Sequence, residues 1–146
     1  METQHQILFV YDNAAALEAR TEILNTYTQL RVKMATNVAE ARSELLRDRY
    51  DCVISGYTYR NSTGLEFLRE VREDHPTLPF LLLADELHPD IIRDAFDAEL
   101  TDYVTPQICQ ASYDLLVHRI EQAIELVKDP IQKQDTNRLA INGNSA

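Results

Sequence analysis

Short apolar runs alternate with longer amphipathic segments along most of this chain. Residues 7–10, 52–54 and 80–84 form short continuous apolar runs, which are typical of strands buried on both faces of a sheet, and the third strand is predicted over 51–55. Residues 30–34 alternate between apolar and polar side chains, as expected for a strand with one less buried face. Residues 101–104 complete a set of five predicted strands.

Helical spacing of apolar residues marks the segments between and after these strands. Asn37 with Glu40, and Thr63 with Glu66, have the spacing of a capping box, in which a side chain accepts from the first turn of a helix. Pro89 stands where a first helical residue is expected. The pattern predicts five helices, which begin near residues 14, 37, 63, 88 and 113.

This strand–helix alternation predicts an α/β domain with a parallel sheet and helices on both faces, because crossovers between parallel strands are right-handed. Functional sites in such sheets form at the carboxyl ends of the strands, here residues 11–13, 56–58, 84–85 and 105–106. We expect one domain over residues 1–127. Residues 128–146 are polar and aperiodic, and we expect a flexible C-terminal tail there.

Charge narrows the classes of partner. The chain has 146 residues and a formal net charge of -10. Such an acidic surface repels phosphate backbones, so direct binding of nucleic acid is not expected. No apolar run approaches the roughly 18 residues of a membrane span, and the N-terminus lacks the features of a signal peptide. We therefore expect a cytoplasmic protein without membrane attachment. No cluster of His and Cys predicts a metal site.

Several motifs carry a family resemblance. The stretches ILFVYDN, RYDCVISGYTYRNSTGLEFLREVRE, PFLLLA and TDYV resemble the CheY-like receiver domain of two-component response regulators, especially its haloarchaeal type. The resemblance covers about residues 6 to 127. It implies a flavodoxin-like, doubly wound, five-stranded parallel sheet in the order 2-1-3-4-5 with five helices.

The resemblance also implies a phosphorylation site, and the chain departs from it. Receivers accept a phosphoryl group on an aspartate after the third strand, next to Mg²⁺ held by two acids after the first strand. A hydroxyl after the fourth strand and a lysine after the fifth hold the phosphoryl oxygens. The acceptor position falls on Gly56, eight residues before Gly64 as in the family. The two acid positions fall on Tyr11 and Asp12, so only the second is an acid. The hydroxyl position falls on Ala84, and the lysine position falls on Pro106.

These departures predict a degenerate pseudo-receiver without a nucleophile, a bound metal, a cofactor or enzymatic activity. The predicted function is a stand-alone, phosphorylation-independent protein–protein interaction module in two-component signalling or transcription regulation. We expect a partner protein or a homodimer at the face formed by the fourth helix, the fifth strand and the fifth helix. Tyr103 is the switch aromatic that the family carries on that strand.

Two alternatives remain open. The first alternative to a pseudo-receiver is a conventional receiver with an unrecognised acceptor. The second is a flavodoxin-like protein that binds a small ligand. The second alternative lacks the glycine-rich phosphate loop expected after the first strand. Tyr57 and Tyr59 fall near the pocket mouth with Tyr11, where they form either a recognition patch or local packing.

Overall fold

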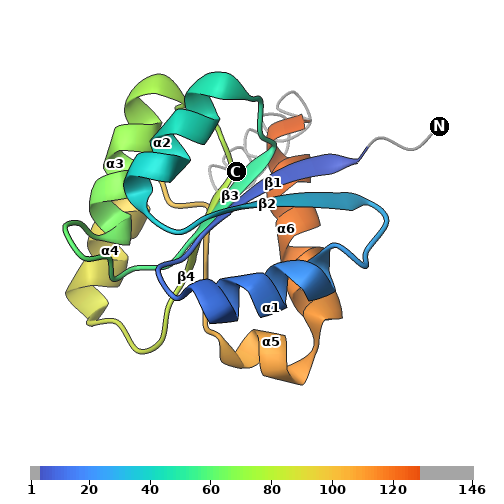
Figure 1. Cartoon of the computed structure of the whole chain (residues 1–146). Coiled ribbons are helices and arrows are strands. Elements are labelled where there is room, and N and C mark those ends of the chain that lie inside the picture. Colours follow the sequence, from blue (N-terminus) through green and yellow to red (C-terminus); the bar gives the residue numbers. More distant parts are fainter. Residues whose placement is uncertain (1–3, 129–146) are drawn as a thin grey trace, which may run out of the picture.

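A single parallel sheet organises the computed structural model, which describes residues 4–128. The five strands lie in the order β2-β1-β3-β4-β5, and every neighbouring pair is parallel (Figure 1). The predicted fold class and strand order are confirmed. The strands are β1 His5–Val10, β2 Leu30–Ala35, β3 Cys52–Ser55, β4 Phe80–Leu83 and β5 Asp102–Val104.

Five longer helices follow the strands as predicted, and one short helix is added. The short helix, α5 Gln107–Ala111, lies before the last long helix; at 5 residues it is too short for a periodic pattern to reveal. The long helices are α1 Ala14–Leu24, α2 Val38–Arg47, α3 Gly64–Asp74, α4 Pro89–Asp97 and α6 Tyr113–Lys128. None of the helices between residues 4 and 128 is long and apolar enough to cross a membrane.

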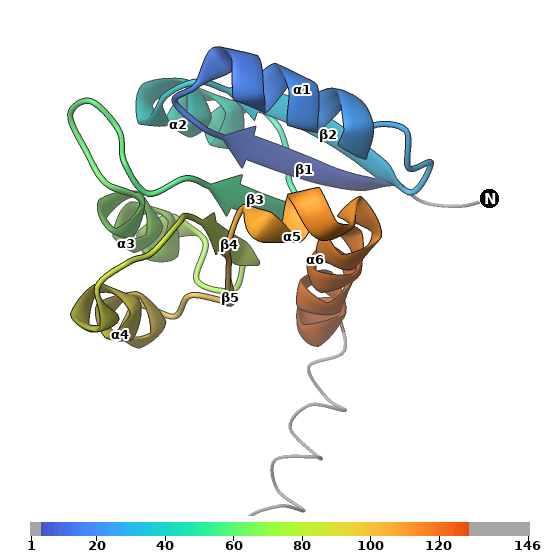
Figure 2. The same ribbon diagram turned by 90° about the horizontal axis from the view of Figure 1, so that it is seen from below.

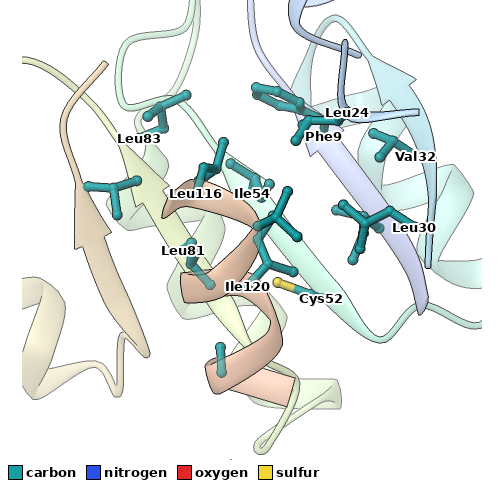
Figure 3. Close-up of a cluster of buried hydrophobic side chains, with 14 of the residues drawn as sticks. Phe9, Leu24, Leu30, Val32, Cys52, Ile54, Leu81, Leu83, Leu116 and Ile120 are labelled. Atoms are coloured by element: carbon teal, nitrogen blue, oxygen red, sulfur yellow. The ribbon is translucent and has the colours of Figure 1, made fainter. Parts of the chain in front are cut away.

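Two hydrophobic clusters hold the helices to the two faces of the sheet. One cluster packs α1 and α6 against side chains such as Phe9, Ile54 and Leu81 (Figure 3). The other packs α2, α3 and α4 against the opposite side chains, including Leu8 and Val53. Successive strand residues point to opposite faces, so each central strand contributes to both clusters. The helices therefore form two layers around the sheet (Figure 2).

The predicted caps set where the helices begin. The Asn37 side chain accepts from the backbone amide of Glu40 at 2.8 Å, and the Thr63 side chain accepts from Glu66 at 3.1 Å. The Glu40 carboxylate returns to the amide of Thr36, one residue before the cap. Thr63 thereby fixes the start of α3 and closes the loop that follows β3, which carries the predicted acceptor position. The tail predicted for residues 128–146 lies outside the described residues except for Lys128.

Candidate functional site

A small pocket opens at the carboxyl ends of β1, β3 and β4. Its volume is about 200 Å³. Five of the predicted site residues come together here, as the topology of a parallel sheet requires. They are Tyr11, Asp12, Gly56, Tyr57 and Ala84, and the remaining lining residues are Thr58, Leu83, Asp85, Glu86 and Leu87.

Pro106, the predicted lysine position, does not line this pocket. It is the N-cap of α5 and makes no side-chain capping hydrogen bond. A proline at this point contributes no cation to the pocket, and the pocket's lining residues include no Lys, Arg or His. The residues that border the pocket therefore lack a positive charge for a bound phosphoryl group.

The ring of Tyr11 fills the space beside Gly56. Residues 10 and 55 are register partners in β1 and β3, and the amide of Gly56 donates to the carbonyl of Val10 at 2.9 Å. Tyr11 and Gly56, the residues that follow this pair, therefore lie side by side. A Cβ atom added at Gly56 would stand 2.8 Å from Cδ1 and 3.1 Å from Cε1 of Tyr11. Real Cβ atoms essentially never approach ring carbons so closely, so a side chain at position 56 requires the Tyr11 ring to move.

Neighbouring side chains hold the Tyr11 ring in place. Phe9 meets it edge to face, with ring centroids 6.2 Å apart and an interplanar angle of 66°. The guanidinium of Arg20 lies 5.0 Å from the ring centroid, within the range of a cation–π contact. Tyr11 also packs against the hydrophobic cluster that lies between the sheet and helices α1 and α6. We therefore interpret its ring as part of the wall of the pocket.

Tyr59 is buried, which agrees with local packing, one of the two alternatives for the loop tyrosines. Its side chain is only 7% exposed. Its hydroxyl donates to the carbonyl of Val10 at 3.0 Å and lies 2.7 Å from Oγ of Ser55, which in turn donates to the carbonyl of Gly56 at 2.8 Å. Burial raises the pKa of Tyr59 well above its usual value. Tyr59 therefore supports the backbone beneath the pocket, and an aromatic patch that includes its ring is not available on the surface.

Tyr57 and Tyr103 are both partly exposed. Tyr57 lines the pocket and packs against the cluster under α2, α3 and α4. The hydroxyl of Tyr103 donates to the backbone carbonyl of Asp85 at 2.8 Å, which ties β5 to the loop after β4. That loop borders the pocket, so Tyr103 connects the pocket to the face formed by α4, β5 and α6.

Acidic side chains dominate the charge of the pocket. Asp12, Asp85 and Glu86 all line it and are exposed to solvent. Asp85 lies within the strand end 84–85 that the sequence indicated, whereas Glu86 was missed, although the polar turn after the apolar run 80–84 was a usable signal. Without a basic neighbour, this pocket disfavours anionic phosphoryl groups.

The residues present do not fit the Mg²⁺ site that the family resemblance implies. Position 56 has no carboxylate, and Tyr11 stands where the first acid is expected. Across residues 4–128, no three or more His, Cys, Asp or Glu side chains are grouped so as to hold a metal ion. Asp12 alone supplies too few oxygen ligands to replace the water around Mg²⁺.

Comparison with known proteins places the sequence in a family. The family model of the response regulator receiver domain matches residues 7–120. The sensory transduction protein LytR of Staphylococcus saprophyticus is 26% identical over 110 residues, which cover 73% of this chain and 42% of that protein. The bacterioopsin transcriptional activator of Halobacterium salinarum is 29% identical over 86 residues, which cover 59% of this chain and 12% of that protein. The chain thus spans less than half the length of these curated relatives.

Solved structures agree on the fold. A CheY-like receiver domain protein from Methanospirillum hungatei superposes with a TM-score of 0.79 at 15% identity, covering 88% of this chain and 99% of that one. The response regulator TrrA of Thermotoga maritima, solved in complex with Mg²⁺ and BeF, gives 0.70 at 23% identity, covering 82% and 99%. With the family match over most of the described residues, these likenesses lead to one conclusion: this chain belongs to the response regulator receiver domain family.

Proposed function

We propose that this receiver domain is a degenerate pseudo-receiver, a phosphorylation-independent interaction module in two-component signalling or transcription regulation. The observation that carries the proposal is the packing of the Tyr11 ring into the space beside Gly56. The acceptor position has no carboxylate, and a neighbouring side chain occupies the volume that one would need. Neither an enzymatic activity nor a cofactor is part of this proposal, and we place its action in the cytoplasm.

A beryllofluoride titration tests the proposal. Beryllofluoride with Mg²⁺ mimics a phosphoryl group on a receiver aspartate, and TrrA, solved with Mg²⁺ and BeF, is the positive control. We expect no amide shift changes near Gly56 or Ala84 in NMR spectra of this chain under conditions that change the spectrum of TrrA. Saturable shifts confined to the pocket would overturn the proposal.

The second candidate function is that of a conventional receiver with another acceptor. Three exposed carboxylates are the candidate acceptors. Asp12, Asp85 and Glu86 border the pocket and are the groups that a phosphoryl donor could reach. Intact mass after incubation with acetyl phosphate and Mg²⁺ distinguishes the candidates. A gain of one phosphoryl group, lost in one of the three acid-to-amide variants, supports the second candidate.

A small-ligand function predicts thermal stabilisation by a nucleotide or flavin instead.

The face formed by α4, β5 and α6 is the proposed docking surface for a partner protein. Tyr103 is partly exposed there, and Phe96 on α4 is 48% exposed. Arg119 on α6 holds Asp102 on β5 through two hydrogen bonds of 2.6 and 2.7 Å, so the two elements form one continuous surface. A variant Phe96→Ala is expected to weaken capture of the native partner while the fold is retained.

Charge on this face favours a different protein over a second copy of this chain. Helices α4 and α6 and strand β5 together have seven acidic and three basic residues, a formal net charge of -4 with histidine neutral. A symmetric dimer brings the same patch of both copies together, so these charges repel each other across a homodimer. A basic partner is attracted by the same field.

A further inference from the structure

A hollow between α2 and α3 shares no lining residue with the pocket described above. Its volume is about 450 Å³. Leu45 on α2 and Phe67 and Val71 on α3 give it apolar walls. Arg42 and Glu70 bridge the two helices at its edge through hydrogen bonds of 2.6 and 3.0 Å, which hold the two walls at a fixed separation.

Leu46 projects from the rim of this hollow into water. It is 89% exposed, the largest exposed fraction among the large hydrophobic side chains of the described chain. It is also one of the lining residues of the hollow. A protruding apolar side chain and an apolar recess therefore stand side by side on one surface. That arrangement is self-complementary, because a two-fold axis next to Leu46 brings the protrusion of each copy to the recess of the other.

The charges around the hollow fit the same arrangement. Helix α2 has two acidic residues and two arginines, and α3 has four acidic residues and two arginines, so their combined formal charge is only -2. Arg47 on α2 is exposed and pairs with Glu44 of the same helix at 3.1 Å, a surface pair that a second copy can share, and Glu73 at the hollow is exposed as well. Both signs of charge are thus present on one surface, which lets an arginine of one copy face an acid of the other. The face of α4, β5 and α6 has a larger excess of acidic residues, with a formal charge of -4, so two copies repel each other more strongly there.

We infer that this chain forms a homodimer through the surface of α2 and α3, with Leu46 of each copy seated in the hollow of the other. The occupant is a second copy because the recess, the protrusion and both charge signs lie on the same patch. This dimer leaves the face of α4, β5 and α6 free for the basic partner, and it does not depend on the phosphorylation state of the pocket.

Sedimentation velocity on the full chain tests the inference with two matched variants. We expect the wild-type chain to shift from monomer to dimer as its concentration is raised toward roughly 1 mM, which gives a measurable dissociation constant. Leu46→Glu is expected to raise that constant at least about 30-fold, as for the central residue of an interface. Phe96→Glu places the same charge on another exposed apolar side chain, on α4, and is expected to leave the constant unchanged. Leu46→Met, which keeps an apolar side chain, is expected to retain the dimer.

A wild-type monomer throughout this concentration range would overturn the inference. A dimer that Phe96→Glu dissociates and Leu46→Glu does not would overturn it as well. Circular dichroism shows whether each variant is folded, and Leu46→Glu is expected to fold normally because its side chain lies almost entirely in water. Amide shifts on dilution give a second readout. They are expected in α2 and α3, and shifts confined to α4 and β5 would contradict the inference.

Discussion

Tyr11 and Gly56 lie 45 positions apart in the sequence and in direct contact in the fold. An added Cβ at Gly56 would be 2.8 Å from Cδ1 of the Tyr11 ring. Gly56 does not have a positive φ, so backbone conformation does not require glycine at this position. The requirement comes from the neighbouring ring. Restoring a carboxylate at position 56 is therefore coupled to the residue at position 11.

A double-mutant cycle measures this coupling. Gly56→Asp alone is expected to lower the free energy of unfolding by about 1–3 kcal/mol, because the new side chain overpacks against the ring. In a Tyr11→Ala background the same substitution is expected to cost less, since the ring is absent. Urea denaturation of the four proteins gives the interaction energy. Equal costs in both backgrounds would show that the ring does not determine the residue at position 56.

Tyr59→Phe tests the buried hydroxyl beneath the pocket. The hydroxyl donates to the Val10 carbonyl and contacts Ser55, so its loss is expected to cost about 1 kcal/mol in the free energy of unfolding. Tyr57→Phe is the control, because the Tyr57 hydroxyl makes no hydrogen bond within the described residues and its ring is less buried. Comparable losses in the two variants would contradict the assigned role of Tyr59.

Alkaline pH is expected to destabilise the fold through its buried tyrosines. Burial raises the pKa of Tyr59 and of Tyr50 above the ordinary value of 10.0. The unfolded chain therefore releases these protons at a pH at which the folded chain still holds them. Stability is fully present below pH 10 and falls as the pH rises from there toward the folded pKa values. Urea midpoints at increasing pH are expected to fall, with a shallower slope in Tyr59→Phe.

Gly64 is expected to tolerate no side chain. A Cβ at this position would overlap the carbonyl oxygen of Gly56 and stand 2.8 Å from a methyl carbon of Leu82 and 3.1 Å from Cα of Tyr57. Two of these atoms belong to the backbone and cannot turn aside. Gly64→Ala is expected to cost about 1–3 kcal/mol despite the better helix propensity of alanine. Ser43→Ala, at an exposed position of α2, is the control and is expected to change stability by less than about 0.5 kcal/mol.

Arg72 connects the end of α3 to the turn before β5. Its Nη1 donates to the carbonyls of His75 and Leu78 at 3.0 and 2.7 Å, and its Nε and Nη2 donate to the carbonyl of Glu99 at 3.0 and 2.8 Å. Glu99 has a φ of 68°, a conformation that needs such support. Arg72→Met is expected to lower the free energy of unfolding by about 2 kcal/mol.

Arg69→Met is the matched control for Arg72→Met, because Arg69 lies on the same helix but is exposed. It is expected to change the free energy of unfolding by less than about 0.5 kcal/mol. Urea denaturation of both variants gives the comparison. Equal effects would show that the three carbonyl contacts of Arg72 add no stability.

Local patterns were sufficient for the five strands and the five longer helices, and the family resemblance predicted the absence of an acceptor. Periodicity reports whether a segment is buried on one face or two, and capping residues such as Thr63 mark where helices begin. The spacing from Gly56 to Gly64 located the acceptor position without any coordinates. The haloarchaeal type and the pseudo-receiver status remain predictions from the resemblance.

Contacts between distant segments were decided only by the tertiary structure. The register that pairs Val10 with Ser55 places Tyr11 against Gly56, and no local pattern contains that register. Tyr59 lies in a polar loop sequence, yet its ring is buried, and its hydroxyl donates to the Val10 carbonyl and lies 2.7 Å from Oγ of Ser55. The sequence by itself determined the five strands and the five longer helices, and its resemblance to the family predicted which phosphorylation-site residue is missing. The sheet decided which side chains fill the space, because packing depends on residues that only the fold brings together.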